Sequence, residues 1–218
     1  MGIPVLILGN SGTGKTTALR NLDPSKSLLI QPIKKSLPFK SKGWKRLSKD
    51  NQDGSIIVSR DYPVIQKSIL KAVNELGRKV IIIDDANYLM SLEEMSRVNE
   101  TGYKKFTDMA INFSGLIFFA QSLPDDVRVY FMAHTQTGDD GRISIKTTGK
   151  MLDDKIVVEG LFTIVMRCHE RDGKHYYTTK KQGDDPVKTP MGMFDSEEID
   201  NDLNLVDSTI CDYEEIGA

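Results

Sequence analysis

The chain contains only two cysteines, Cys168 and Cys211, and neither belongs to a CxxC pair. A disulfide framework and a cysteine-ligated zinc site are therefore excluded as organising features, and a reducing cytoplasm is the expected compartment. No apolar run approaches the ~18 residues that a membrane-spanning helix needs. No positively charged segment precedes the first apolar run, so we expect neither a secretory signal nor membrane insertion.

Basic residues are missing from the last part of the chain, because residues 193–218 contain nine acids and no Lys or Arg. The rest of the chain holds 29 bases and 22 acids, so a basic body carries an acidic tail although the net charge is only -2. This asymmetry occurs in proteins that bind nucleic acids. A solvated C-terminal helix is the simpler explanation, and the apolar stripe of Ile199, Leu203, Val206 and Ile210 favours packing of that helix.

Short apolar runs alternate with stretches of helical periodicity. The apolar runs predict buried strands at residues 5–8, 27–30, 55–58, 80–83 and 127–132. Helices are expected at residues 15–22, 62–77 and 91–121, the last with a break near Gly102, and again over the last twenty residues. A β-hairpin is expected from residues 163–168 and 175–179, joined across Asp172 and Gly173.

This alternation predicts an α/β fold with a mostly parallel sheet, an appended β-hairpin and a C-terminal helix. We expect residues 1–192 to form one domain, and the acidic helix or tail of residues 193–218 to pack on it.

The strongest motif lies between the first predicted strand and the first predicted helix, where the sequence matches GxxxxGK(S/T). Glycines in such a loop let successive backbone N–H groups face a phosphate, and the following helix adds its positive end. Lys15 is expected to reach the β- and γ-phosphates and Thr16 to hold Mg²⁺. The predicted nucleotide-binding residues are Gly9, Asn10, Ser11, Gly12, Thr13, Gly14, Lys15, Thr16 and Thr17.

Two acids follow the strand at residues 80–83. Asp84 is the expected second magnesium residue, because an acid at a strand end suits this metal. Asp85 is the candidate general base, since a neighbouring acid can orient the attacking water. Glu93 and Glu94 lie close in the sequence and are alternatives for that role.

About sixty residues separate the phosphate loop from Asp84, and another predicted strand, residues 55–58, lies between these motifs. With this arrangement the chain resembles the phage-encoded RecA-like P-loop ATPases of the single-strand annealing or recombinase type, which often carry an AAA-domain label. The matching segments are residues 9–16, 81–85, 131–134 and 180–189, so the resemblance spans roughly residues 3–190. It implies a three-layer RecA-like core, ATP and Mg²⁺ as ligands, and the host cytoplasm as the compartment.

The resemblance also suggests roles for residues late in the chain. His134 or Gln136 would sense the γ-phosphate, and Lys180, Lys181 and Lys188 would enter the ATP site of a neighbouring subunit, so a homo-oligomer is implied. A cation on the transition-state charge would accelerate hydrolysis. The alternatives are a histidine bonded to the backbone at position 134 and a solvated loop lysine at position 188.

One departure from the family stands out. RecA-like enzymes usually carry an acid at the end of the second strand, but residues 30–36 here contain none. Either Asp85 or another acid activates the water, or hydrolysis is slow and the protein is mainly an ATP-gated binder.

Two basic stretches are candidates for binding single-stranded DNA. Residues 25–49 hold eight bases and no acid, with Phe39 and Trp44 interleaved, as in cationic tracks with stacking platforms. In the second stretch, residues 135–150, a glycine-rich loop follows the sensor position. A solvated insertion packed through its aromatic residues, and a plain flexible hairpin, are the respective alternatives. The candidate DNA contacts are Lys34, Lys35, Lys40, Lys42, Trp44, Lys45, Arg46, Arg142, Lys146 and Lys150.

The expected function is therefore ATP binding and hydrolysis coupled to single-stranded DNA in phage-type recombination or replication. A slowly hydrolysing accessory or loader that binds a replication partner is the first alternative. A small-molecule kinase is the second, disfavoured because such enzymes have an arginine-rich lid and the arginines here are few and scattered.

Overall fold

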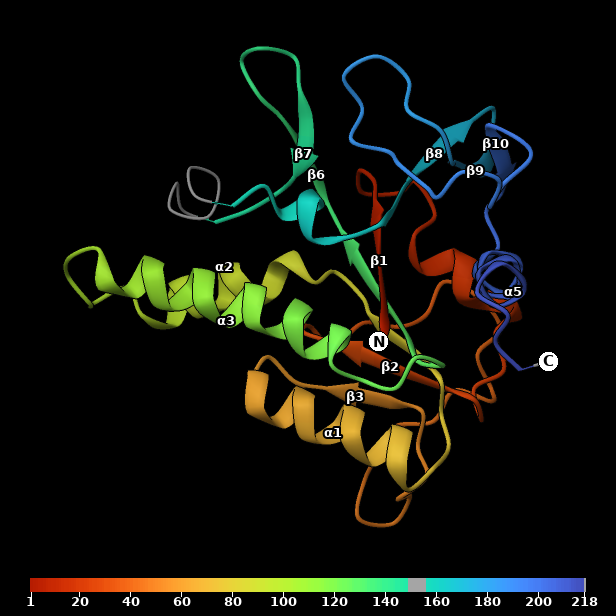
Figure 1. Cartoon of the computed structure of the whole chain (residues 1–218). Helices are drawn as coiled ribbons and strands as arrows, with labels where there is room; N and C mark the ends of the chain where they lie inside the picture. The colour runs from red at the N-terminus through yellow and green to blue at the C-terminus, as the bar shows by residue number, and fades with distance from the viewer. Residues whose placement is uncertain (149–155, 218) are drawn as a thin grey trace.

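The computed structural model describes residues 1–148 and 156–217 and contains one eight-stranded sheet in the order β10-β9-β8-β1-β5-β4-β2-β3 (Figure 1). The strands from β8 to β3 run parallel to their neighbours, and β9 and β10 add antiparallel pairs at one edge. The predicted α/β fold with a mostly parallel sheet is confirmed. The strand bounds are β1 Ile3–Leu8, β2 Ser27–Gln31, β3 Ile56–Val58, β4 Val80–Ile83, β5 Arg128–Ala133, β8 Ile164–Arg171, β9 Lys174–Thr178 and β10 Glu198–Asp200.

Helices cover both faces of this sheet. On one face lie α1 (Tyr62–Asn74), α2 (Asn87–Ser96) and α3 (Lys104–Gln121), and on the other lie η1 (Thr16–Asn21) and α5 (Leu203–Tyr213) (Figure 1). The central strands are buried throughout because their continuous apolar side chains meet a helical layer on each side. The predicted break of the long helix near Gly102 is confirmed by the turn between α2 and α3.

The helix after the phosphate loop differs from the prediction in kind. Residues 16–21 form a short 3₁₀ helix rather than an α-helix over 15–22, and no side chain caps its start. Asp23 and Pro24 stop it early, since proline disfavours helical geometry in the residue before it. Six residues carry only a small dipole, so a phosphate would depend mainly on the loop N–H groups and Lys15.

Two short elements were not predicted, η2 (Val158–Leu161) and β10, because each has only three or four residues and shows no hydrophobic periodicity. The hairpin of β6 (Thr135–Thr137) with β7 (Ile143–Ile145) lies in the stretch for which a hairpin was the alternative to a DNA-binding loop.

Strand order brings three distant segments to one edge of the sheet. β5 lies between β1 and β4, whereas β3, the strand that separates the two motifs in the sequence, lies at the far edge. Leu8 is aligned with Ala133 and Ile83 with Phe131. The residues that follow these parallel strands therefore meet at their common carboxyl edge, where open α/β sheets bind ligands.

The acidic C-terminal helix is fastened to the sheet by a buried ion pair. Arg128 in β5 donates two hydrogen bonds to Asp207 of α5, at 2.9 and 2.8 Å, and the Tyr130 hydroxyl donates a third at 2.6 Å. Leu203, Val206 and Ile210 of the same helix are buried against the sheet. One acid of the tail is thus part of the core, while its other acids border solvent.

In the described ranges, 1–148 and 156–217, we find no helix with the length and apolar character needed to cross a membrane.

We predict that Asp207→Ala lowers the free energy of unfolding by about 3–5 kcal/mol, because it leaves the Arg128 guanidinium buried without its partner. Asp212→Ala, which removes an exposed acid of the same helix, should change it by less than about 0.5 kcal/mol. Denaturant titration measures both values. Equal effects would show that Asp207 does not hold the helix.

Candidate nucleotide site

The phosphate loop has a backbone that only glycine adopts easily at two positions. Gly12 and Gly14 have φ values of 83° and 99°. A Cβ atom at Gly9 would lie 2.6 Å from Thr13 Oγ1 and 2.9 Å from the Cys168 carbonyl oxygen. One at Gly14 would lie 2.6 Å from the His175 ring. The loop is thus packed tightly against β8 and β9, which fixes the direction of its N–H groups.

Lys15 is held at the centre of this loop. Its ammonium donates to the carbonyl oxygens of Gly9 at 2.8 Å and Asn10 at 3.0 Å, and lies 3.4 Å from His134 Nδ1. Burial lowers the pKa of Lys15, and the nearby carboxylates oppose that effect. A buried cation that is held inside a glycine-rich loop by backbone carbonyls is suited to bind phosphate oxygens.

Thr16 and Asp84, the residues expected to hold Mg²⁺, lie in direct contact. The Thr16 hydroxyl lies 3.1 and 3.0 Å from the two carboxylate oxygens of Asp84. Burial, followed by repulsion from Asp85, raises the pKa of Asp84 to about 6. A hydroxyl beside a buried carboxylate fits Mg²⁺, which prefers oxygen ligands and keeps several positions for water and phosphate. Nowhere in residues 1–148 and 156–217 do three or more His, Cys, Asp or Glu side chains gather as a complete metal cage.

Asp85 lies at the centre of a polar network and has an unusual backbone. Its φ is 61°, a left-handed conformation in which Asp is tolerated better than most residues. Its carboxylate accepts from His134 Nε2 at 3.1 Å and forms an ion pair with Lys35. Burial alone would raise the pKa of Asp85, but the hydrogen bonds from His134 and Lys35 outweigh it and lower the pKa to about 2.

These contacts place the histidine between two charged groups. Its Nδ1 lies 3.4 Å from the Lys15 ammonium, and its Nε2 lies 3.1 Å from the Asp85 carboxylate. His134 therefore bridges the phosphate-loop lysine and Asp85. Its backbone N–H donates to the Asn87 side chain at 3.1 Å, which anchors the ring to the start of α2.

A hollow of about 260 Å³ opens between these groups. It is lined by phosphate-loop residues and by Lys35, Asp85, Tyr88 and His134. Lys35 was predicted to be a DNA contact, but its side chain borders this hollow instead.

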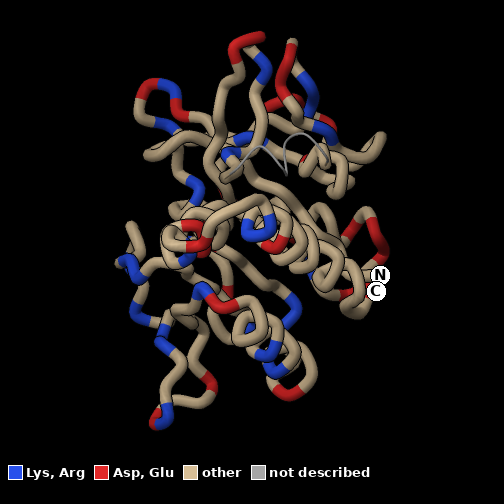
Figure 2. The backbone as a smooth tube through the Cα atoms, turned by 90° about the vertical axis from the view of Figure 1, so that its left-hand side faces the viewer, with Lys and Arg blue, Asp and Glu red and all other residues tan. Residues whose placement is uncertain are grey.

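The remaining basic candidates of residues 25–49 are exposed: Lys34, Lys40, Lys42, Lys45 and Arg46. Figure 2 shows several blue positions in succession along the extended loop at its lower left. Trp44, in contrast, is only 8% exposed. It belongs to the apolar core on the face of the sheet that η1 and α5 cover, and Phe39 packs against that core, partly buried. The prediction that Trp44 is a stacking platform is therefore wrong, because its apolar area is used to fasten the insertion to the sheet.

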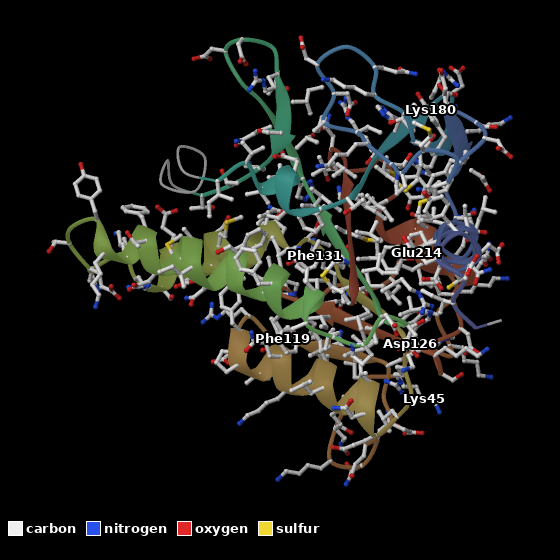
Figure 3. The ribbon with its side chains drawn as sticks, in the orientation of Figure 1. Lys45, Phe119, Asp126, Phe131, Lys180 and Glu214 are labelled. Atoms are coloured by element: carbon white, nitrogen blue, oxygen red, sulfur yellow. The ribbon has the colours of Figure 1, made fainter. Side chains whose placement is uncertain are left out.

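The late basic segment is far from the first one. Lys45 and Lys180 lie at opposite ends of the molecule (Figure 3). Lys188 is exposed and pairs its backbone with Val165 of β8, at 2.7 and 2.9 Å. Its proposed action on a neighbouring subunit stays a prediction.

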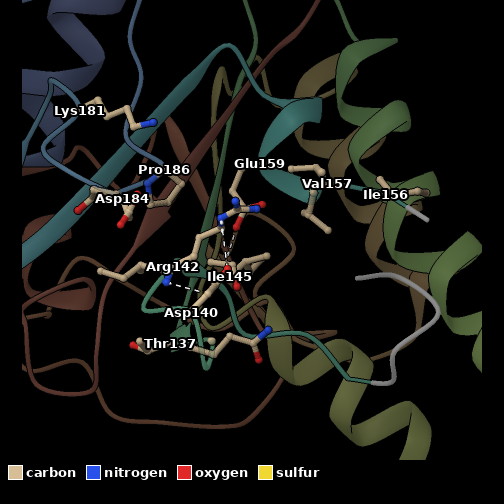
Figure 4. Close-up of a pocket in the computed structure, with 16 residues that line it drawn as sticks. Thr137, Asp140, Arg142, Ile145, Ile156, Val157, Glu159, Lys181, Asp184 and Pro186 are labelled. Carbon is tan, nitrogen blue, oxygen red and sulfur yellow. Dashed lines mark hydrogen bonds and ion pairs between the residues drawn. The ribbon is translucent and has the colours of Figure 1, made fainter. Parts of the chain in front are cut away.

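Gln136 does not line the phosphate hollow, so of the two sensor candidates only His134 reaches it. Gln136 lines a separate pocket of about 500 Å³ together with Arg142 and Ile145 of the β6–β7 hairpin (Figure 4). The residue of β6 that does touch the phosphate loop is Thr135, whose hydroxyl donates to Asn10 Oδ1 at 2.5 Å. Arg142 and Lys146 are exposed on the hairpin, and Lys150 lies outside the described residues.

Glu93 is not a candidate base here. Its carboxylate is occupied by Arg97 at 3.1 Å and Asn112 at 2.9 Å, and neither Glu93 nor Glu94 borders the hollow. The position where the resemblance implies an acid, the end of β2, carries Gln31, whose amide is buried with no hydrogen-bond partner in the described structure.

Comparisons with known proteins add little. No protein-family model matches the chain, and no curated protein does. Among solved structures, a KaiC-like protein, PH0186, from the hyperthermophilic archaeon Pyrococcus horikoshii OT3 is 15% identical, with a TM-score of 0.42 over 83% of this chain and 79% of that one. So weak a likeness decides nothing about function, which has to be inferred from the site.

We predict opposite stability effects at the two adjacent acids. Asp84→Asn should raise the free energy of unfolding at pH 7 by about 3 kcal/mol, because the raised pKa of Asp84 means that its charge is unfavourable in the fold. This gain should vanish below pH ~4, where Asp84 is protonated folded and unfolded.

Asp85→Asn should instead lower the free energy of unfolding at pH 7 by about 2 kcal/mol, since the lowered pKa of Asp85 reflects favourable contacts of its charge. That loss should fade as the pH falls below about 4 toward 2. Denaturant titrations in EDTA, with Asp212→Asn as control, give both signs. The same sign for both variants would contradict this assignment of environments.

Proposed function

We propose that the protein binds ATP with Mg²⁺ and hydrolyses it, and that this activity is coupled to single-stranded DNA in phage-type recombination or replication. The observation that carries the proposal is the convergence of the phosphate loop, the Thr16–Asp84 pair and the Asp85–His134 pair at one edge of the sheet, where the loop, Asp85 and His134 line one hollow. Three parallel strands supply them, so the geometry is set by the sheet rather than by mobile loops.

Each residue has a role that its contacts support. In hydrolysis a water oxygen bonds to the γ-phosphorus while the bond to the bridging oxygen breaks. ADP leaves with that electron pair, and the water proton passes to the released phosphate or to solvent. Lys15 binds the β- and γ-phosphate oxygens, and Mg²⁺ held by Thr16 and Asp84 would neutralise charge on the same groups. Asp85 and His134 orient the water.

A slowly hydrolysing nucleotide switch is the second candidate, and one observation favours it. A carboxylate whose pKa is about 2 is a weak base at neutral pH, and Asp85 is occupied by two donors. In that case ATP occupancy, rather than turnover, would control binding of DNA or of a replication protein.

The DNA proposal is supported by the connection between the site and the β6–β7 hairpin. Thr135 donates to Asn10 of the phosphate loop, and the Lys146 N–H donates to the His134 carbonyl at 2.7 Å. Exposed Arg142 and Lys146 on this hairpin, and the exposed lysines of residues 34–49, are suited to phosphodiester contacts. A homo-oligomer, with Lys188 acting on a neighbouring subunit, belongs to the same proposal.

The test is ATP hydrolysis with and without single-stranded DNA. We expect a rate that rises with DNA and falls at least about 100-fold in Lys15→Ala, which loses the loop cation. A rate indifferent to DNA, together with no DNA binding in the presence of ATP, would reject the coupling and favour the nucleotide switch. A phosphorylated small-molecule product would indicate the kinase.

For the DNA contacts, we predict that Lys40→Ala with Lys42→Ala weakens binding and reduces the slope of log affinity against log salt by about 1.4, since each lysine releases about 0.7 counterion from a single strand. Lys67→Ala with Lys71→Ala on α1 is the matched control. Fluorescence anisotropy with a labelled oligonucleotide at several salt concentrations measures the slope. An unchanged slope would remove this segment from the interface.

A further inference from the structure

Lys35 occupies a position that its place in the sequence does not suggest. It follows β2, in the stretch where the resemblance implies an acid, and its side chain returns to the carboxyl edge of the sheet. There its ammonium forms an ion pair with Asp85 and lies 5.1 Å from the centroid of the Tyr88 ring. Its side chain is 44% exposed, and Lys35 lines the same hollow as Gly12, Lys15 and Thr16.

We propose that Lys35 is a second phosphate-binding cation supplied by the same chain, which contacts the γ-phosphate of bound ATP and thereby distinguishes ATP from ADP. This rests on the proposed ATP function. It adds to that function the residue that would contact the γ-phosphate, the group that ATP has and ADP lacks.

The element that supplies Lys35 supports this role. Lys15 comes from the phosphate loop after β1, whereas Lys35 comes from the segment after β2. Lys35 borders the hollow together with loop residues and with Asp85, Tyr88 and His134. A phosphate chain bound by the loop within this hollow would therefore have a second cation, from another segment, within reach of its terminal group.

The charges of the hollow also favour a second cation. Asp84 lies beside Thr16 and Asp85 lines the hollow, so before a metal ion binds, Lys15 and Lys35 together only balance the two carboxylates. A γ-phosphate adds negative charge beside Asp85, and repulsion from that carboxylate would oppose its binding unless a cation lies between them. Lys35, already paired with Asp85, is the cation that can contact both anions.

Lys35 has the freedom that such a contact requires. A lysine ammonium has three donors on a flexible four-carbon stem, so one can stay with Asp85 while others turn to a phosphate oxygen. The Tyr88 ring makes a cation–π contact with the Lys35 ammonium, which helps to keep it at the edge of the hollow.

If Lys35 supplies this charge within one chain, the lysines of a neighbouring subunit are not needed for it. The cation would then act on the phosphoryl group in the manner of an arginine finger provided in cis. Nucleotide discrimination should be independent of protein concentration.

The test compares ATP and ADP affinities, with Mg²⁺, of the wild-type chain, Lys35→Ala, Lys35→Arg and Lys67→Ala, by calorimetry. Lys35→Ala should weaken ATP binding about tenfold, the effect of losing one hydrogen bond to a charged group, and ADP binding by less than about twofold. Lys35→Arg should keep most of the preference, and Lys67→Ala, an exposed α1 lysine, should match wild type. Steady-state kcat should fall about 100-fold in Lys35→Ala.

Equal losses for ATP and ADP, or none for either, would overturn the role of Lys35 while the ATP function stands. Wild-type protein that binds neither nucleotide would reject both. Should Lys35→Ala unfold, Lys35→Gln keeps a long polar side chain beside Asp85 and decides the same comparison.

A mixing experiment tests the action within one chain. Lys15→Ala and Lys35→Ala proteins are combined, and ATP hydrolysis is followed. No recovery is expected, because each active site lacks one cation of its own. Recovery toward the wild-type rate would show that Lys35 acts across a subunit interface.

Discussion

The candidate site depends on the carboxylate of Asp85 and on the left-handed backbone that carries it. This conformation turns the chain directly after β4, so that the Ala86 N–H bonds to the Met132 carbonyl at 2.7 Å and α2 begins at Asn87. Asn87 in turn accepts from the backbone of His134. The turn thus joins β4, β5 and α2, while its carboxylate gathers His134 and Lys35. The left-handed conformation of Asp85 costs free energy, and the contacts of its carboxylate and of the following turn offset that cost. Such conformations are common where function requires a fixed geometry.

Adjacent acids with opposite environments divide the work of the site. Asp84 is buried beside the Thr16 hydroxyl, and burial disfavours its negative charge, so a bound cation would stabilise the ionised carboxylate. Asp85 already has His134 and Lys35, so its charge is compensated within the protein. In the proposed function, Asp84 would therefore bind the metal ion, and Asp85 would position its polar neighbours. Because the left-handed backbone at Asp85 turns the chain directly after Asp84, the two side chains meet different neighbours, and one dipeptide can serve two such functions.

The local patterns in the sequence predicted the frame of this site well. Continuous apolar runs identified the central strands, and the glycine loop with Lys15 and Thr16 identified the phosphate side, because each depends on residues close in sequence. The position of Lys35 was not predicted, for the opposite reason: beside Lys34 it has the same local chemistry, and only the course of the loop after β2 brings Lys35, and not Lys34, to the hollow. Trp44 is a second example, because the local sequence of a tryptophan among lysines is the same whether its ring stacks on a base or packs in the core.

Those segments that connect the site to the surface are the ones with the weakest local signal. The β6–β7 hairpin is held to the phosphate loop by the Thr135 hydroxyl. It is held to His134, the residue after β5, by the Lys146 N–H. A shift of Asn10 or His134 on phosphate binding would act on both attachments of the hairpin at once. Packed elements change between discrete arrangements rather than by continuous deformation, so two attachments that move together would transmit such a shift as a rigid rotation of the hairpin. In the proposed function, these two contacts are the route by which a bound nucleotide would act on the exposed cations of this hairpin.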